Sequence, residues 1–171
     1  MTTMNAPAMI TQNTERRLRL AGQMGRGVAV IATAPERTRN RDTHHPFRFD
    51  SYFQYLTGFG EPGSVVVIVA GDKPRSLLFC REKDMEREIW DGFRHGPEGA
   101  QTRFGFDEAH PIGALDEMMP KLLADQPALF ADIGGDPAWD SRVIGWLNAV
   151  RAQVRTGITA PSEIRDRKSV V

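Results

Sequence analysis

Few side chains of this sequence could do chemistry, and two pairs of them have suggestive spacing. The adjacent residues His44 and His45 could bind a metal ion, but neighbours on a loop point in different directions. No further ligand follows one helical turn later, so a solvated loop is the better interpretation. Asp132 and Asp136 lie at the end of an apolar run, where carboxylates could hold Mg²⁺. Because Pro137 follows Asp136, a turn that caps a helix is the stronger hypothesis.

Cys80 is the single cysteine and the only thiol that could act as a nucleophile. It ends an apolar run, where a free cysteine is most often a small core residue. One cysteine excludes a disulfide framework and a four-cysteine zinc site, and it fits a reducing cytoplasm. The glycine-rich residues 22–27 follow a predicted helix instead of a strand, which is the wrong context for a phosphate-binding loop.

The composition excludes several classes of protein. The 171 residues (19.1 kDa) allow one domain of ordinary size. Lysine and arginine number 22, as do aspartate and glutamate, so the net charge of zero argues against a nucleic-acid binder. The longest apolar run, residues 65–70, is far shorter than the roughly 18 residues of a membrane-spanning helix, and the N-terminus lacks a secretory signal pattern. We therefore expect a cytoplasmic protein with neither nucleic acid nor membrane as partner.

The order of elements predicts an α/β fold with a mixed β-sheet flanked by helices on both faces. Residues 1–13 lack periodicity and are predicted to form a flexible N-terminus. Both sets of side chains on strand 64–70 should be buried, because the run has no polar face. The other predicted elements are a helix over 14–24, a strand over 28–32, a loop over 33–49, a helical turn over 51–56, a strand over 76–80 that forms a hairpin with 64–70, a short helix or turn over 84–90, a loop with a possible helical piece over 95–105, a helix over 114–123 kinked or broken at Pro120, a strand over 128–132, a helix from 137 to 150 and a charged tail over 162–171.

Two aromatic segments allow more than one interpretation. Residues 45–59 crowd aromatic side chains into a loop-rich stretch, which is either a local core that pins the loop or the wall of a recognition site. Trp90 lies beside Asp91 and Gly92 and could be an interfacial anchor. The alternative for Trp90 is an ordinary core tryptophan, as expected for Trp139 and Trp146 on the predicted helix.

Three landmarks resemble those of one protein family. The first, from Arg48 to Pro62, has the pattern R-x-x-S-x-F-x-Y-x-T-G-F-x-E-P. The second, over residues 83–96, is similar to R-D-x-x-x-E-I-W-x-G-x-R-x-G, with Lys83 in place of the usual arginine. The third is Thr159-Ala160-Pro161. Their order and spacing resemble the Xaa-Pro aminopeptidases (aminopeptidase P), over nearly the whole chain from residue 14 onward.

The resemblance implies a two-domain parent enzyme with an N-terminal domain of the creatinase or prolidase type, similar to ribonuclease H in topology. Its C-terminal pita-bread domain would carry two Asp, one His and two Glu as ligands of two Mn²⁺ ions, and a metal-bound hydroxide would attack the Xaa-Pro bond. This chain ends about where that domain would begin. We therefore expect residues 14–161 to be the non-catalytic N-terminal domain and residues 162–171 to begin a linker. The chain alone should hold no metal and be inactive.

The resemblance also implies three residues that face the substrate cleft and several partners. Asp42 would lie near the N-terminal side of a proline-containing peptide, where a carboxylate attracts an α-amine. Trp90 would wall the pocket and therefore be exposed in this chain alone, and the Arg155 guanidinium would reach the substrate beyond the proline. The expected partners are the pita-bread catalytic domain and other subunits of a homo-oligomer, because the domain supports oligomer formation in the family.

Two alternatives remain open from the sequence. The chain could be a stand-alone binding or assembly module that kept this fold after losing the peptidase domain. It could also be a small enzyme with a ribonuclease H-like carboxylate cluster, but Asp132 is the one acidic residue at a strand end that we can nominate.

Overall fold

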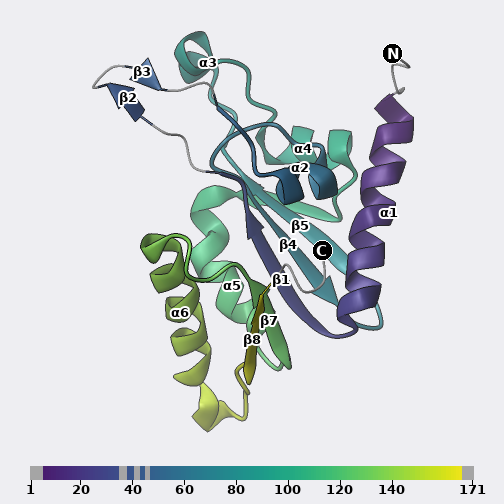
Figure 1. Ribbon diagram of the computed structural model, residues 1–171, viewed down its shortest axis with the longest axis vertical. Coiled ribbons are helices and arrows are strands. Elements are labelled where there is room, and N and C mark those ends of the chain that lie inside the picture. The colour runs from purple at the N-terminus through teal and green to yellow at the C-terminus, as the bar shows by residue number, and fades with distance from the viewer. Residues whose placement is uncertain (1–5, 35–37, 41–42, 45–46, 167–171) are drawn as a thin grey trace.

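The computed structural model describes residues 6–34, 38–40, 43–44 and 47–166, and it has a six-stranded mixed sheet between two layers of helices (Figure 1). The strand order is β6-β5-β4-β1-β7-β8. The strands are β1 (Gly27–Ala32), β4 (Val65–Ala70), β5 (Arg75–Cys80), β6 (Glu108–Pro111), β7 (Ala128–Ala131) and β8 (Glu163–Asp166). β1, β4 and β5 form an antiparallel meander, while β7 runs parallel to β1, β8 parallel to β7, and β6 parallel to β5.

Six α-helices surround the sheet, and five of them pack on it. α1, α2 and α4 share an apolar core with one face of the sheet, and α5 and α6 share another core with the opposite face. α3 stands apart from both layers, at one end of the molecule (Figure 1). The helices are α1 (Ala6–Met24), α2 (Ser51–Thr57), α3 (Met85–Asp91), α4 (Gly96–Phe104), α5 (Leu115–Leu123) and α6 (Pro137–Arg151), with 3₁₀ turns η1 (Ile112–Ala114) and η2 (Val154–Thr156).

Alternation along the central strands divides the core between the two faces, as the sequence predicted. In β4, Val65 and Val67 face the α5–α6 layer, while Val66 and Ile68 face the layer of α1, α2 and α4. All four side chains are buried, and Val69 is partly buried. A strand with apolar residues on both faces must be covered on both sides, so the mixed sheet between two helical layers is confirmed.

The N-terminal helix begins earlier than expected. α1 starts at Ala6, so residues 6–13 are helical and not the frayed segment that their composition suggested. The proline at position 7 lies in the first helical turn, where its missing N–H breaks no hydrogen bond. Asn13 is buried against the end of α2, close to Gly58. Packing on α2 therefore supports a helical turn that has no clear amphipathic pattern.

Four strands occur where the sequence predicted none. β2 (Thr38–Asn40) and β3 (Thr43–His44) pair within the expected loop over 33–49. β6 lies between α4 and η1, in a stretch for which we made no prediction. β8 lies within the predicted linker, at the edge of the sheet, and its four residues are all exposed. Backbone pairing with β7 fixes β8, and side-chain patterning cannot reveal a strand that buries no face.

Two helical details also differ from expectation. α5 continues through Pro120 as one helix instead of breaking there. Residues 95–105, expected to be loop with a possible helical piece, form the nine-residue α4. In the part of the chain that the structure describes, no helix is both long and apolar enough to cross a membrane.

Candidate functional site

The described residues hold no metal site built from the candidate ligands. His44 ends the short strand β3, whereas His45, like the cleft candidate Asp42, lies outside the described residues. Among the residues described, no group of three or more His, Cys, Asp or Glu side chains is arranged to hold a metal ion. This finding gives no support to a ribonuclease H-like carboxylate cluster in the described part of the chain.

Asp132 and Asp136 line a cavity of about 590 Å³ beside the carboxyl ends of β1 and β7. The Asp136 side chain accepts a hydrogen bond of 2.9 Å from the backbone N–H of Ala138, which confirms its predicted role as the cap of α6. Trp139 and Arg142 also border this cavity. Asp136 is thus committed to the helix terminus and not to a cation.

Cys80 is fully buried at the end of β5. Burial, the largest cause, and the nearby charge of Glu61 together raise the pKa of the thiol to about 12, while Arg81 opposes the shift. A thiol of this kind is protonated at neutral pH and inaccessible, so it is a core residue and not a nucleophile.

We expect a maleimide reagent at pH 7.5 to leave Cys80 unlabelled in the native chain and to modify it fully in denaturant, because the buried thiol becomes reactive only on unfolding. Mass spectrometry of the two samples measures this. Rapid stoichiometric labelling under native conditions would contradict the burial of this side chain.

The most distinctive surface feature is the Trp90 arm, which we define as residues 85–93, comprising α3 and the turn that follows it. No residue of α3 is buried. Four large apolar side chains of the arm are exposed: Met85 by 71%, Ile89 by 79%, Trp90 by 87% and Phe93 by 61%. Apolar side chains gathered on one projecting segment typically mark a surface that a partner covers. The expected exposure of Trp90 is therefore confirmed.

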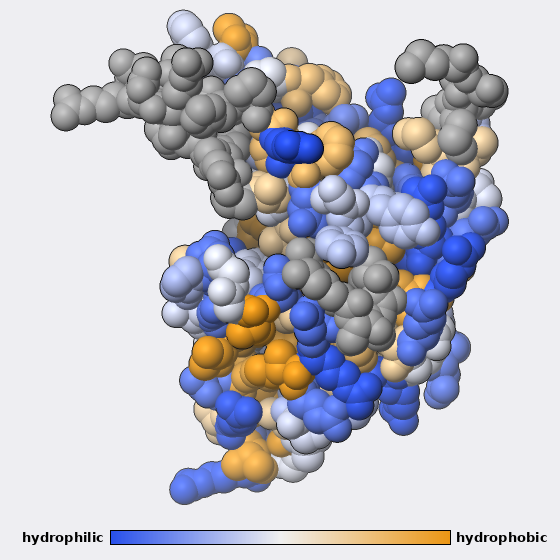
Figure 2. All heavy atoms as spheres, in the orientation of Figure 1, coloured by the Kyte–Doolittle hydropathy of each residue, from blue (hydrophilic) through white to orange (hydrophobic). Residues whose placement is uncertain are grey.

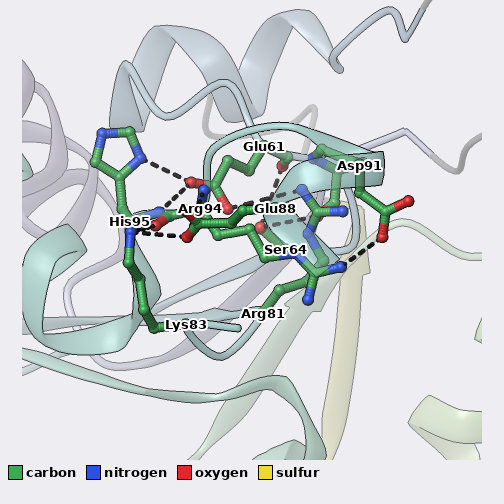
Figure 3. A network of polar contacts seen from close by, with 9 residues as sticks. Glu61, Ser64, Arg81, Lys83, Glu88, Asp91, Arg94 and His95 are labelled. Atoms are coloured by element: carbon green, nitrogen blue, oxygen red, sulfur yellow. Dashed lines mark hydrogen bonds and ion pairs between the residues drawn. The ribbon is translucent and has the colours of Figure 1, made fainter. Parts of the chain in front are cut away.

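A network of charged residues lies at the base of the arm (Figure 3). The Lys83 ammonium contacts the Glu88 carboxylate at 2.7 Å and donates a 2.8 Å hydrogen bond to the backbone carbonyl of Arg94. Glu88 also accepts a 3.2 Å hydrogen bond from the backbone N–H of Arg94. The hydrogen bond from Lys83 is the main cause that lowers the pKa of Glu88, so this carboxylate is ionised at neutral pH. These contacts tie the two ends of the arm together.

Glu61 anchors the same segment from the opposite side (Figure 3). This glutamate follows α2 and is almost completely buried. One of its oxygens lies 2.7 Å from both the backbone nitrogen and the ring Nδ1 of His95. Arg81 approaches the other oxygen at 3.8 Å. The Glu61 of the first sequence motif thus meets the residues of the second motif in space.

Arg155 lies in η2 and is exposed. Figure 1 places α3 at one end of the long axis and the chain after α6, which includes η2, at the other. Within one chain the structure therefore does not bring Arg155 and Trp90 together. A cleft that used both residues would need a further domain or subunit.

The face shown in Figure 2 has a second apolar region, over α6 and the neighbouring strands. Among the described residues that follow β7, the exposed large apolar ones are Ile133, Ile144, Val154 and Ile164. Trp146 is buried, whereas Trp139 is only partly buried, so the expectation of a fully buried pair is wrong for Trp139. The Trp139 ring, which borders the cavity, packs edge-on against the Trp146 ring with 5.6 Å between the ring centroids.

Sequence reasoning missed the charged network, although its residues stood inside the motifs. Lys83, Glu88 and Arg94 alternate in charge over a short segment, which alone is typical of any solvated surface. Contacts between the two separate motifs would have revealed these residues. Such contacts cannot be seen without the fold.

Comparison with known proteins agrees with this geometry. A family model described as the aminopeptidase P N-terminal domain matches residues 13–130. The chain therefore belongs to the aminopeptidase P N-terminal domain family. The Xaa-Pro aminopeptidase of Escherichia coli (strain K12) is 35% identical over 159 residues, and that of Haemophilus influenzae is 36% identical over 118 residues.

Solved structures show the same fold. The chain matches an aminopeptidase of Pseudomonas aeruginosa with a TM-score of 0.89 and 37% identity, over 99% of this chain and 38% of that one. It matches a substrate complex of an Escherichia coli aminopeptidase P variant with a TM-score of 0.87 and 33% identity, over 93% and 37%. The aligned residues make up 91% of this chain but only 36% of the Escherichia coli relative's sequence. The chain thus spans between about a quarter and two fifths of the length of these relatives.

Proposed function

We propose that this chain serves as the non-catalytic N-terminal domain of a Mn²⁺-dependent Xaa-Pro aminopeptidase, which removes the N-terminal residue that precedes proline. The observation that carries this proposal is the Trp90 arm, where a segment inside a family motif exposes four large apolar side chains. In this proposal Trp90 forms part of the wall of a cleft that the catalytic domain completes. The same domain supports assembly of the parent enzyme into a homo-oligomer.

The metal chemistry is assigned to the other domain. Among the described residues, no group of three potential ligands is placed to bind a cation. One relative of known structure is a zinc-substituted Escherichia coli aminopeptidase P in complex with product, which indicates that such enzymes are metal-dependent. We assign the two Mn²⁺ ions and the attacking hydroxide to the pita-bread domain of the parent and no chemical step to this chain.

The roles of the other two candidate residues rest on the family resemblance. Arg155 is exposed and available to a partner, which is compatible with contact to a substrate carboxylate or carbonyl. Asp42 lies outside the described residues and remains a prediction as the group near the α-amine. Because Arg155 and the Trp90 arm lie toward opposite ends of the long axis of the molecule, we propose that they serve different cleft regions or different subunits.

A chimera tests the proposal. Residues 1–171 replace the matching segment of the Escherichia coli enzyme, and cleavage of an Xaa-Pro peptide is measured with Mn²⁺. We expect turnover from the chimera and none from the isolated chain. Trp90→Ala should lower kcat/KM of the chimera by about tenfold or more, because it removes a wall of the cleft.

Ile144→Ala is the control, because Ile144 is another exposed apolar residue, 47% exposed, but lies on α6. Its kcat/KM should stay within about twofold of the unsubstituted chimera. Equal kcat/KM for the Trp90→Ala and unsubstituted chimeras would contradict the cleft role. Turnover by the isolated chain above a Mn²⁺ blank would contradict its non-catalytic role.

The alternative of a stand-alone assembly module is also compatible with an exposed apolar arm. Sequencing the DNA downstream of the Val171 codon separates the two hypotheses. An in-frame continuation that encodes the two Asp, one His and two Glu ligands supports the peptidase domain. A stop codon there favours the module.

A further inference from the structure

The Trp90 arm lacks the usual means of holding a helix in place. α3 has seven residues and buries none of them, whereas an isolated helix shorter than about 12–15 residues is marginal in water. Apolar packing on the sheet, which fixes the other helices, is therefore not what orders α3. Its local support is the Asp84 side chain, which accepts hydrogen bonds from the backbone N–H groups of Glu86 and Arg87, both at 3.1 Å. A single helix cap of this kind cannot order the arm alone.

The remaining support is polar and lies at the two ends of the arm. Lys83 precedes the arm and Arg94 follows it, and the Lys83 ammonium reaches the Arg94 carbonyl directly. Glu88, in the middle of α3, contacts both ends, since it accepts from the Lys83 ammonium and from the Arg94 N–H. Asp91 adds an ion pair of 2.8 Å to the Arg94 guanidinium. The arm is thus closed on itself by charge-assisted hydrogen bonds.

A buried carboxylate then fixes this closed arm to the rest of the domain. Glu61 accepts from the backbone N–H of His95 and contacts the His95 ring, both at 2.7 Å. The ring in turn packs on Phe59, Phe93 and Phe104 at centroid distances between 4.9 and 5.7 Å. The Lys83 ammonium lies 4.1 Å from the centre of the Phe93 ring. The base of the arm is therefore a small polar and aromatic joint between two motifs.

We propose that Glu88 and Glu61 are positioning residues that hold the Trp90 arm in its partner-competent conformation before any partner is bound. Ordering the arm in advance lowers the entropy that association must overcome, which is the physical basis of preorganisation. That the arm meets a catalytic domain and a substrate cleft rests on the proposed function, whereas the ordering of the arm does not. Neither glutamate needs to touch the substrate for this role.

Amide hydrogen exchange of the isolated chain tests the ordering directly. We expect Glu88→Ala to speed exchange at residues 86–94 by about tenfold or more, while amides of β1 and β4 stay within about twofold. Glu88→Gln keeps an acceptor for Lys83 and Arg94, so its effect should be smaller than that of Glu88→Ala. Glu61→Ala should loosen the turn around His95 in the same way.

Glu117→Ala is the control for removal of an ion-paired glutamate. The Glu117 carboxylate contacts the Lys121 ammonium at 2.9 Å on the exposed face of α5, and both residues are distant in sequence from the arm. Its removal should leave exchange of residues 86–94 unchanged. Unchanged exchange of the arm in both Glu88→Ala and Glu61→Ala would overturn the proposal. A uniform rise in exchange across the sheet would also overturn it, because the role would then be general stability.

A double-mutant cycle in the chimera tests the link to Trp90. If Glu88 acts through the arm, Glu88→Ala should lower kcat/KM of the parent chimera but not of the Trp90→Ala chimera. Equal losses in both backgrounds would overturn the positioning role. If Trp90→Ala itself has no effect, the proposed function fails, and the exchange experiment alone decides whether the two glutamates order the arm.

Discussion

Arg17→Ala is expected to destabilise the domain by about 3–5 kcal/mol, since three buried carbonyls would lose their donors at roughly 1–3 kcal/mol each. Arg17 is 2% exposed and lies on the buried face of α1, between Asn13 and Leu20. Its guanidinium donates to the backbone carbonyls of Leu56 at 3.0 Å, Phe104 at 3.2 Å and Gly105 at 2.6 Å. These carbonyls end α2 and α4, so one side chain satisfies the termini of two helices.

Burial is also why lysine cannot replace this side chain. Desolvation lowers the pKa of Arg17 to about 10, and Asp107 partly offsets the effect. A lysine has a compact ammonium in place of the planar fork, and it loses its charge more readily when buried. We therefore expect Arg17→Lys to lie close to Arg17→Ala in stability.

Urea unfolding followed by circular dichroism measures both variants. Arg19→Ala is the control, because Arg19 is exposed two residues further along α1. It should change the free energy of unfolding by no more than about 0.5 kcal/mol. A loss of less than about 1 kcal/mol for Arg17→Ala would show that water replaces the guanidinium at these carbonyls.

Trp146→Ala is expected to cost about 3–5 kcal/mol, whereas Trp90→Ala should leave the stability of the isolated chain almost unchanged. Trp146 is 3% exposed in the core between α5 and α6. Its indole N–H donates a 2.7 Å hydrogen bond to Asp116, which also accepts from Arg142 at 2.6 Å. Removing this ring leaves a cavity and breaks a link between two helices. Trp90 has no such contacts to lose.

Thermal unfolding of the variants checks this contrast. Trp139→Ala provides an intermediate case, because its partly buried ring packs edge-on against Trp146. The expected order of destabilisation is Trp146, then Trp139, then Trp90. A loss for Trp90→Ala as large as that for Trp146→Ala would contradict its exposed position and, with it, the cleft role.

Several elements could be predicted because their sequence patterns are local. The β-branched run of 65–70 required cover on both faces, and the strand is buried on both. Asp136-Pro137 predicted the start of α6, and the aspartate caps it. The exposure of Trp90 was also expected, although from its family motif and not from any periodicity.

Other elements depend on neighbours that are distant in sequence. Residues 6–13 and β8 have no amphipathic pattern, and contacts with α2 and with the edge of β7 decide their structure. Pro120 suggested a break, yet α5 continues through it while burying Met119, Leu122 and Leu123 on the sheet. In these places packing energy outweighs local propensity.

The sequence by itself determined the α/β class, the two-sided core and the family, because these follow from hydrophobic alternation and from three ordered motifs. Only the tertiary structure showed that Glu61 of the first motif and Glu88 of the second both hold the base of the Trp90 arm, through the backbone N–H groups of His95 and Arg94. Only the tertiary structure placed Trp90 and Arg155 toward opposite ends of the long axis of the molecule. Charge and hydropathy in a linear sequence do not encode which distant groups become neighbours, since the sheet order that joins them is set by packing of the whole core.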